Sequence, residues 1–284
     1  MGKWIRGILI AVLAAVFLFS AGKLLGIEGG YRESRKTYSG AAEEYTKPAE
    51  VTAAVSAEDE APAGGEPAAE REAERELIYA PIEVDFDYLC RINSDVIGWI
   101  YCPDTVINYP VVWGRDNDYY LERNYRGEPD SSGTIFADAG NMKDLTDSNI
   151  ILYGHHMQDM SMFATLKYWL KQEYYEEHPV MWLLTPEQDY RIELFSGYVT
   201  SAESETYTIF RGAGEEFDAY LRSALARSEF RAETELDATG KYVLLSTCAY
   251  SFQLARTVLH GRLIPVDSAG GLPIEHSAAA DEGQ

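Results

Sequence analysis

The pattern of apolar and polar positions changes several times along the chain. Residues 7–22 form an uncharged apolar run, whereas residues 28–80 are rich in Glu, Ala, Pro and Gly and hold few large apolar residues. Short β-prone runs follow, separated by turns, and the chain after residue 266 is small and polar. This pattern predicts four parts: an N-terminal anchor at 1–27, an acidic low-complexity stalk at 28–80, a folded domain at 81–266 and a disordered tail at 267–284.

The apolar run has the length and flanks of a membrane segment. Trp4, Ile5 and the apolar residues after Lys23 extend it towards the ~20 residues that a bilayer requires. Lys3 and Arg6 precede it, so the positive-inside tendency places the N-terminus in the cytoplasm and the rest of the chain outside the cell. The sequence therefore predicts a single-pass membrane protein. A cleaved signal peptide, cut near residues 20–22, is the alternative.

The folded domain combines many short strands with a few helical stretches. No regular strand-helix-strand alternation runs through it, which disfavours a parallel doubly wound sheet and favours a closed or nearly closed β-barrel with added helices. Helices are predicted at 86–93, 119–124, 162–171 and 215–228, paired strands within 99–112, and further strands at 133–137, 148–153, 180–185, 190–199, 242–247 and 256–264.

Composition narrows the possible functions. The chain has 24 Lys and Arg against 46 Asp and Glu, a formal net charge of −22, and such a surface repels nucleic acid. The hydrophobic share of 46% is too high for disorder throughout the chain. Three cysteines cannot form a disulfide framework, and at least one is free or paired between molecules. We expect Cys90 and Cys102 to be reduced.

Three residue types that support acyl chemistry come at predicted strand ends. Cys248 directly follows the strand 242–247, and Gly154-His155-His156 follows the strand 148–153. An imidazole beside a thiol can stabilise the thiolate and later protonate a leaving amine. Arg256 opens the next apolar run, where a guanidinium can bind an oxyanion. A buried structural cysteine and histidines that only complete a turn are the alternatives.

Several motifs resemble the sortases, specifically class B. The resemblance covers residues 86–264 and rests most strongly on Leu245-Ser246-Thr247-Cys248, followed eight residues after the cysteine by Arg256. The amphipathic stretch 215–228 resembles the helix that distinguishes class B from class A. Further matching segments are NSDVIGWI at 93–100, YPVV at 109–112, DNDYYL at 116–121, GTIF at 133–136 and YGHHM at 153–157.

This resemblance implies an eight-stranded sortase barrel with an N-terminal helix, and a cysteine transpeptidase that needs neither a metal nor an organic cofactor. Such an enzyme cleaves the C-terminal sorting signal of a surface protein or pilin after a Thr, through a thioacyl intermediate. It then joins the protein to an amine of a peptidoglycan precursor or to a pilin lysine. Class B resemblance points to a signal of the Asn-Pro-x-Thr or Ser-Pro-x-Thr type.

The resemblance also implies roles for individual residues. Cys248 would be the nucleophile, His155 the general acid and base, and Arg256 the donor to the substrate carbonyl or oxyanion, with His156 a structural neighbour. Since Ala249 and Tyr250 follow the nucleophile, no carboxylate is assigned to orient the imidazole. Core packing is the alternative role for Leu121 and Tyr153. The residues implied to contact substrate are Asn117, Leu121, Tyr153, Ser246 and Thr247.

Two other classes of function use the same residues or the same barrel. A cysteine hydrolase or peptidase would release the acyl group to water, and an inactive surface-binding module would use the barrel without the chemistry. The presence of Cys248, His155 and Arg256 together favours the transpeptidase over the binding module.

Overall fold

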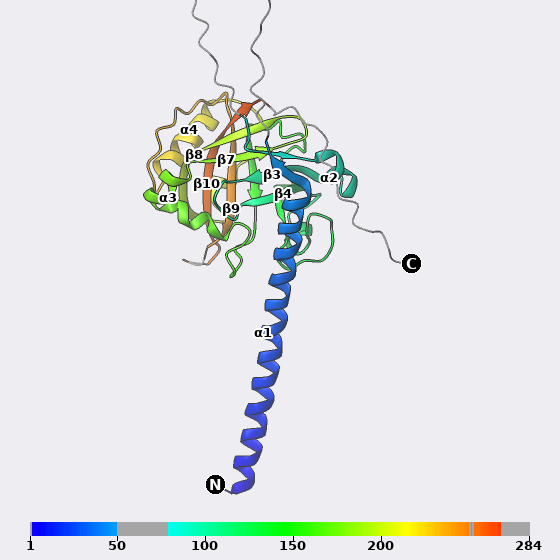
Figure 1. Cartoon of the computed structure of the whole chain (residues 1–284). Helices are drawn as coiled ribbons and strands as arrows, with labels where there is room; N and C mark the ends of the chain where they lie inside the picture. The colour runs from blue at the N-terminus through cyan, green and yellow to red at the C-terminus, as the bar shows by residue number, and fades with distance from the viewer. Residues whose placement is uncertain (1, 50–78, 250, 252, 268–284) are drawn as a thin grey trace, which may run out of the picture.

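The computed structural model describes residues 2–49, 79–249, 251 and 253–267. Its centre is a closed β-barrel of eight strands in the order β10-β8-β7-β3-β4-β5-β6-β9 (Figure 1), which confirms the predicted fold. The pairs β4-β5 and β6-β9 are parallel, and the other neighbours are antiparallel. The strands are β3 (Val96–Tyr101), β4 (Asn108–Trp113), β5 (Ile135–Ala137), β6 (Asn149–Tyr153), β7 (Val180–Leu184), β8 (Asp189–Ser201), β9 (Lys241–Cys248) and β10 (Ala255–Val266).

Helices cover the barrel on two sides. They are α2 (Phe86–Ile92), α3 (Gln172–Glu177) and α4 (Glu215–Ala226), with 3-10 turns η1 (Tyr119–Glu122), η2 (Ala164–Leu170) and η3 (Glu205–Tyr207). The predicted helices at 119–124 and 162–171 are thus 3-10 turns, and α3 and η3 were not predicted. At the start of α2 the Asp85 carboxylate accepts the Tyr88 N–H at 2.8 Å, which satisfies a donor that the helix leaves unpaired.

The amphipathic helix predicted before the cysteine strand is α4. Its apolar stripe, Phe217, Leu221 and Ala224, is buried and packs over the outer face of the barrel in a second apolar cluster that includes Ile151 and Leu244. Burial of one such large side chain stabilises the fold by ~1.5–3 kcal/mol. Because α4 covers one face and the barrel interior the other, β9 is buried along almost its whole length. The cysteine strand is therefore held rigidly.

The structure differs from the predicted stalk over residues 28–49. These residues continue the N-terminal helix α1 (Lys3–Tyr45) and then form β1 (Thr46–Pro48), which pairs with β2 (Ile82–Val84). Tyr38 and Tyr45 are 4% and 1% exposed and belong to the main core. Spaced seven residues apart, they lie on one face of the helix, together with the buried Ser34 and Ala41, and this face docks on the barrel. Residues 50–78 and 268–284 lie outside the described residues.

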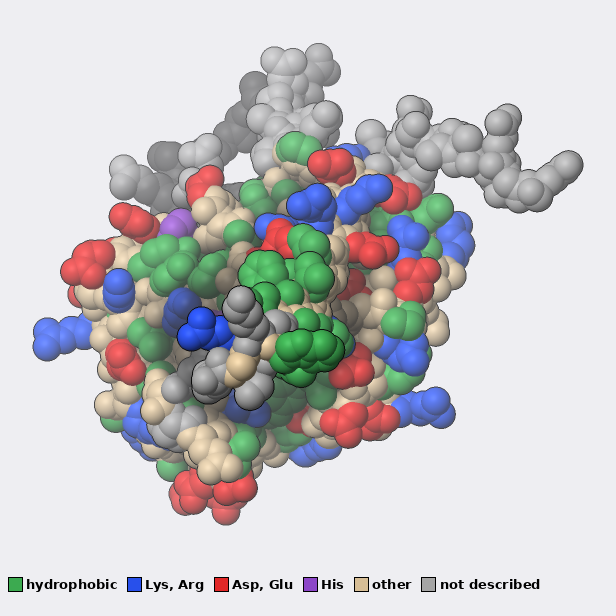
Figure 2. All heavy atoms as spheres, turned by 90° about the horizontal axis from the view of Figure 1, so that it is seen from below, with side chains coloured by type: hydrophobic (Ala, Val, Ile, Leu, Met, Phe, Trp, Pro, Cys, Tyr) green, Lys and Arg blue, Asp and Glu red, His purple; other side chains and the backbone are tan. Residues whose placement is uncertain are grey.

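The first half of α1 leaves the barrel as a rod with the N-terminus at its far end (Figure 1). Its side chains from Ile8 to Ile27 are almost all exposed, and the helix is long and apolar enough to cross a membrane. Seen from below, apolar side chains of this rod stand at the centre of the view, and acidic and basic side chains are interspersed around them (Figure 2). One helix is thus both an exposed apolar rod and a part of the core.

Candidate active site

The pairing of three strands gathers the predicted catalytic residues at one edge of the barrel. β6 and β9 run parallel with Tyr153 opposite Ser246, so their carboxyl ends lie side by side. His155 and Cys248 each come two residues after these positions. β10 runs antiparallel to β9 with Arg256 directly opposite Cys248. The fold therefore brings a thiol, an imidazole pair and a guanidinium to neighbouring strand ends.

Gly154 follows β6 at a position where side chains pack closely against the backbone. Its N–H donates to the Ser246 carbonyl at 3.1 Å, which extends the β6-β9 pairing by one position. A Cβ at this glycine would lie 2.5 Å from the Ile135 side chain and 2.7 Å from Phe163, closer than packed carbon atoms can approach. A glycine directly before His155 is thus required by packing.

The two histidines take different partners. His155 Nε2 lies 2.6 Å from the Leu121 carbonyl oxygen, and His156 Nδ1 lies 2.7 Å from the Cys248 carbonyl oxygen. A carbonyl oxygen only accepts, so each of these nitrogens donates its N–H. The bond of His155 leaves its Nδ1 as the nitrogen that can exchange a proton. A backbone carbonyl, rather than a carboxylate, orients this imidazole.

His156 ties the loop after β6 to the end of β9. Burial lowers its pKa and outweighs the bond to the Cys248 carbonyl, which raises it. Since the shift keeps the ring neutral near neutral pH, His156 is fitted to hold the backbone of Cys248. This contact agrees with the expectation that His156 is structural.

Arg256 is half-buried, and its Nη1 donates to the Ala255 carbonyl at 3.1 Å. Within the part of the chain that the structure describes, Arg256 makes no ion pair. Most of its guanidinium donors are therefore available to an incoming oxygen. This differs from Arg211, which pairs with the buried Asp147.

The described residues of the chain include no cluster of His, Cys, Asp and Glu that could hold a metal ion. All three cysteines are free. Cys102 is buried with its Sγ 3.6 Å from the Val180 carbonyl oxygen, and burial raises its pKa to about 12. Burial also raises the pKa of Cys90. Since the thiolate is the nucleophile, neither of these two thiols is suited to catalysis, and Cys248 at the strand end is the candidate.

Comparison with known proteins agrees with this geometry. No family model matches the chain. Sortase B of Listeria monocytogenes is 32% identical over 178 residues, which are 62% of this chain and 72% of that protein. Sortase B of Staphylococcus aureus is 31% identical over 187 residues, 65% of this chain and 77% of the relative. The chain belongs to the sortase B family.

Solved structures of sortase B enzymes share the fold. A Bacillus anthracis sortase B, crystallised in complex with AAEK1, has a TM-score of 0.65 at 32% identity and covers 83% of this chain and 98% of its own. The S. aureus sortase B crystal structure has a TM-score of 0.60 at 32% identity, over 64% of this chain and 87% of that one. This chain is therefore an enzyme of the sortase family, and the class B resemblance of its motifs is confirmed.

Two of the residues expected to contact substrate in this sortase meet at a carboxylate that sequence reasoning missed. The Tyr153 hydroxyl donates to Asp138 Oδ2 at 2.8 Å, and Asn117 Nδ2 donates to the same oxygen at 3.1 Å. Burial, followed by the charge of Asp138, raises the pKa of Tyr153, which therefore stays a hydrogen-bond donor. Asp138 follows a predicted strand at 133–137, and this position at a strand end was the only signal for it.

Tyr207 is a second residue that the sequence did not single out. It lies in η3, its hydroxyl is 2.8 Å from Ser246 Oγ, and its ring stacks on Tyr153 at 6.1 Å between centroids. Burial raises its pKa, while the nearby charge of Arg256 acts in the opposite direction. Tyr207 thus covers the strand end beside the nucleophile, although 41 residues separate it from Cys248.

The other residues predicted to contact substrate lie either against the main core or within the buried strand β9. Leu121 is half-buried against the main core and presents its carbonyl to His155, so the structure gives it a packing role and a backbone role. Ser246 and Thr247 are buried in β9, 1% and 2% exposed. The Thr247 hydroxyl has no hydrogen-bond partner among the described residues, which leaves one buried donor at the position before Cys248.

Proposed function

We propose that the chain is a membrane-anchored cysteine transpeptidase. It cleaves the C-terminal sorting signal of a surface protein or pilin after a Thr and transfers the protein to an amine of a peptidoglycan precursor or to a pilin lysine. The observation that supports this proposal is the position of Cys248, His155 and Arg256 at neighbouring ends of β9, β6 and β10. Membership of the sortase B family agrees with it.

The first half of the proposed reaction forms a thioester. The Cys248 sulfur attacks the Thr carbonyl carbon, so that an S–C bond forms and the C–N bond to the next residue breaks. The thiol proton passes to His155 and then to the leaving amine. Arg256 donates hydrogen bonds to the carbonyl oxygen as negative charge develops on it.

In the second half the acceptor amine attacks the thioester carbon. A new amide C–N bond forms, the S–C bond breaks, and the proton lost by the amine returns through His155 to the Cys248 sulfur. The bond from His155 Nε2 to the Leu121 carbonyl holds the ring and leaves Nδ1 for these transfers. Atoms and charges balance without an additional reactant.

Thr247 and Tyr153 are proposed to bind the signal peptide. Thr247 is proposed from its place in β9 directly before Cys248, where its buried hydroxyl has no hydrogen-bond partner among the described residues. Asn117 and Tyr153, both joined to Asp138, offer an amide and an aromatic ring on the β5-β6 side of Cys248. Ser246 is proposed to act indirectly, because its hydroxyl contacts that of Tyr207, whose ring stacks on Tyr153.

The proposed membrane arrangement follows from α1. Its apolar residues 8–27 span the bilayer with the N-terminus in the cytoplasm, and the barrel lies outside the cell. The catalytic domain is residues 81–266 together with the docked residues 28–49, and residues 50–78 link the two along the sequence. A fragment beginning near residue 77 would expose the core surfaces that Tyr38 and Tyr45 cover.

The test is cleavage of quenched fluorescent peptides with Asn-Pro-x-Thr and Ser-Pro-x-Thr motifs by the full chain in detergent micelles. Cys248→Ala is expected to abolish cleavage, and Cys90→Ser, the matched control, to leave it unchanged. With oligoglycine, a diaminopimelate-containing stem peptide or a lysine peptide added, mass spectrometry is expected to find the acyl part joined to an amine.

Release of the free acid alone, with every amine present, would identify a hydrolase instead. If the wild type cleaves no peptide and Cys248 also resists alkylation by iodoacetamide, the transpeptidase proposal is wrong and a binding module is favoured.

A further inference from the structure

The His loop, residues 154–163, carries both histidines and is held under strain. Met160 and Met162 have φ values of +66° and +54°, in the left-handed region that side chains with a Cβ rarely adopt. Two such residues within three positions persist only where surrounding contacts hold them. The contacts that hold this loop therefore decide where His155 lies.

Contacts within the His loop join its tip to its two histidines. The Asp159 carboxylate accepts from the Ser161 N–H at 3.1 Å and from the Ser161 hydroxyl at 2.6 Å. The Phe163 N–H donates to the His155 carbonyl at 3.1 Å, and Met162 forms a β-bridge with His156. A shift of the loop tip at 159–162 is thus transmitted to the histidines.

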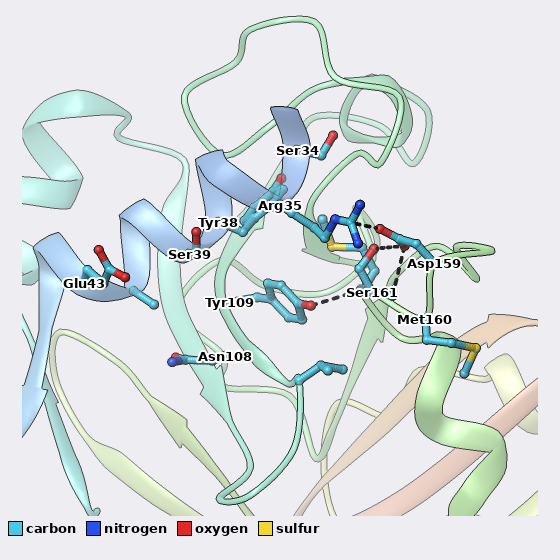
Figure 3. A pocket seen from close by; sticks show the side chains of 13 residues that line it. Ser34, Arg35, Tyr38, Ser39, Glu43, Asn108, Tyr109, Asp159, Met160 and Ser161 are labelled. Atoms are coloured by element: carbon cyan, nitrogen blue, oxygen red, sulfur yellow. Dashed lines mark hydrogen bonds and ion pairs between the residues drawn. The ribbon is translucent and has the colours of Figure 1, made fainter. Parts of the chain in front are cut away.

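The docked half of α1 reaches this loop tip directly. Arg35 Nε lies 3.5 Å from Asp159 Oδ2, and the Tyr38 ring packs edge-on against Tyr109 at 5.6 Å (Figure 3). The Tyr109 hydroxyl in turn accepts the N–H of the strained Met162 at 3.1 Å. A cavity of about 460 Å³ separates the helix from the loop elsewhere, so the loop rests on discrete contacts rather than on continuous packing.

Tyr38 is also linked to His155 by a second route, through Gly133 and Leu121. The Tyr38 hydroxyl donates to the carbonyl of Gly133, a glycine with φ +57° that packs tightly against η1. A Cβ at Gly133 would lie only 2.6 Å from the Leu121 carbonyl oxygen, the same oxygen that accepts from His155 Nε2. The helix therefore contacts the loop that carries His155 and, through Gly133, supports the segment that orients its ring.

We infer that the docked half of α1 positions His155, with Arg35 and Tyr38 as positioning residues. The helix that continues into the apolar rod is then part of the catalytic apparatus rather than only an attachment. This inference rests on the proposed function, in which His155 transfers protons. Neither residue touches substrate, and both act through the His loop or through Leu121.

The test compares three variants of the full chain in detergent micelles. Arg35→Glu replaces the attraction to Asp159 with repulsion, Arg35→Lys keeps the charge, and Arg32→Glu makes the same charge change on the exposed surface of the same helix. Arg35 is half-exposed, so reversal is expected to lower kcat about fivefold with KM changed less than about twofold. Arg35→Lys and Arg32→Glu are expected to stay within about twofold of wild type.

Hydrogen exchange of the amides at 157–163 gives a readout that does not depend on activity. Arg35→Glu is expected to speed exchange there and to leave exchange in β9 unchanged. Unchanged loop exchange, unchanged kcat, or an equal loss in Arg32→Glu would each overturn the inference. If the wild type cleaves no peptide and Cys248 also resists alkylation, the proposed function fails, and loop exchange still decides whether Arg35 holds the His loop.

Discussion

His155 and His156 are neighbours in the chain but bind different backbone carbonyl groups. His155 donates to the Leu121 carbonyl on the η1 side, whereas His156 donates to the Cys248 carbonyl on the β9 side. The bond of His155 fixes a ring that keeps one nitrogen for proton exchange. The bond of His156 fixes the backbone of the nucleophile. Two adjacent imidazoles at a strand end can thus divide chemistry and support between them, and the partner of each nitrogen decides the role.

The largest effect expected from this comparison is on turnover. His155→Gln can keep the donor to Leu121, because the Gln amide reaches about as far as Nε2, but it provides no base. We expect kcat/KM for peptide cleavage to fall by about 10³-fold, within the range for loss of general acid-base catalysis, with the thermal midpoint little changed. His156→Asn is expected to retain activity within about tenfold. If the two losses were reversed, the roles would have to be exchanged.

A third imidazole, that of His260 in β10, extends the comparison to the stability of the fold in acid. It is 2% exposed, bonds to the Tyr198 hydroxyl at 3.0 Å, and its pKa is lowered to about 3 by burial and by Arg227. A depressed pKa means that below about pH 6.5 the unfolded chain binds a proton that the folded chain does not, so stability falls as the pH falls from 6.5 towards 3.

Between pH 6.5 and 5 this single group is expected to lower the free energy of unfolding by ~2 kcal/mol. His260→Gln, measured by urea unfolding at both pH values, is expected to flatten that slope. His156, with a smaller shift in the same direction, is expected to add less. An unchanged slope in His260→Gln would contradict the burial argument.

The next largest effect is expected from losing the hydrogen bond between His156 and the Cys248 carbonyl. His156→Ala leaves the Cys248 carbonyl without this donor, at a cost of ~1 kcal/mol. For a domain of this size that corresponds to a thermal midpoint lower by about 2–4 °C. His156→Asn, whose amide nitrogen takes the position of Nδ1, is expected to recover most of the difference. Equal midpoints for the Ala and Asn variants would show that the bond adds no stability.

The smallest expected effect concerns Asp138 and the two side chains that donate to it. Asp138→Asn replaces the carboxylate that accepts from Tyr153, Asn117 and the Gly140 N–H by an amide and is expected to raise KM for signal peptides about three- to tenfold, with kcat changed less. Tyr153→Phe, which removes one of the two side-chain donors, is expected to have a weaker effect of the same kind. A fall in kcat at unchanged KM would indicate that Asp138 acts in the chemical steps rather than in substrate binding.

Much of the barrel could be predicted because most of its strands are short β-prone runs between turn residues. The positions of Cys248, Arg256 and the histidines followed from where those runs end. Asp138 and Tyr207 could not be found in this way, because their roles depend on bonds to Tyr153 and Ser246 that link separate segments. The docking of Tyr38 was missed for the same reason, since Tyr109 and Tyr125 lie 71 and 87 residues further along the chain.

The unbroken course of α1 has a consequence for how the enzyme meets its substrates. A helix of 43 residues is about 65 Å long, and the described structure shows no break between the apolar rod and the half that docks on the barrel. With the rod in a bilayer, the barrel cannot tumble independently, and it shares the tilt and rotation of the helix. The strand ends that carry Cys248 would then keep a constant height and angle above the membrane surface. The enzyme would then meet other membrane-borne molecules by diffusion in two dimensions, with its own orientation fixed.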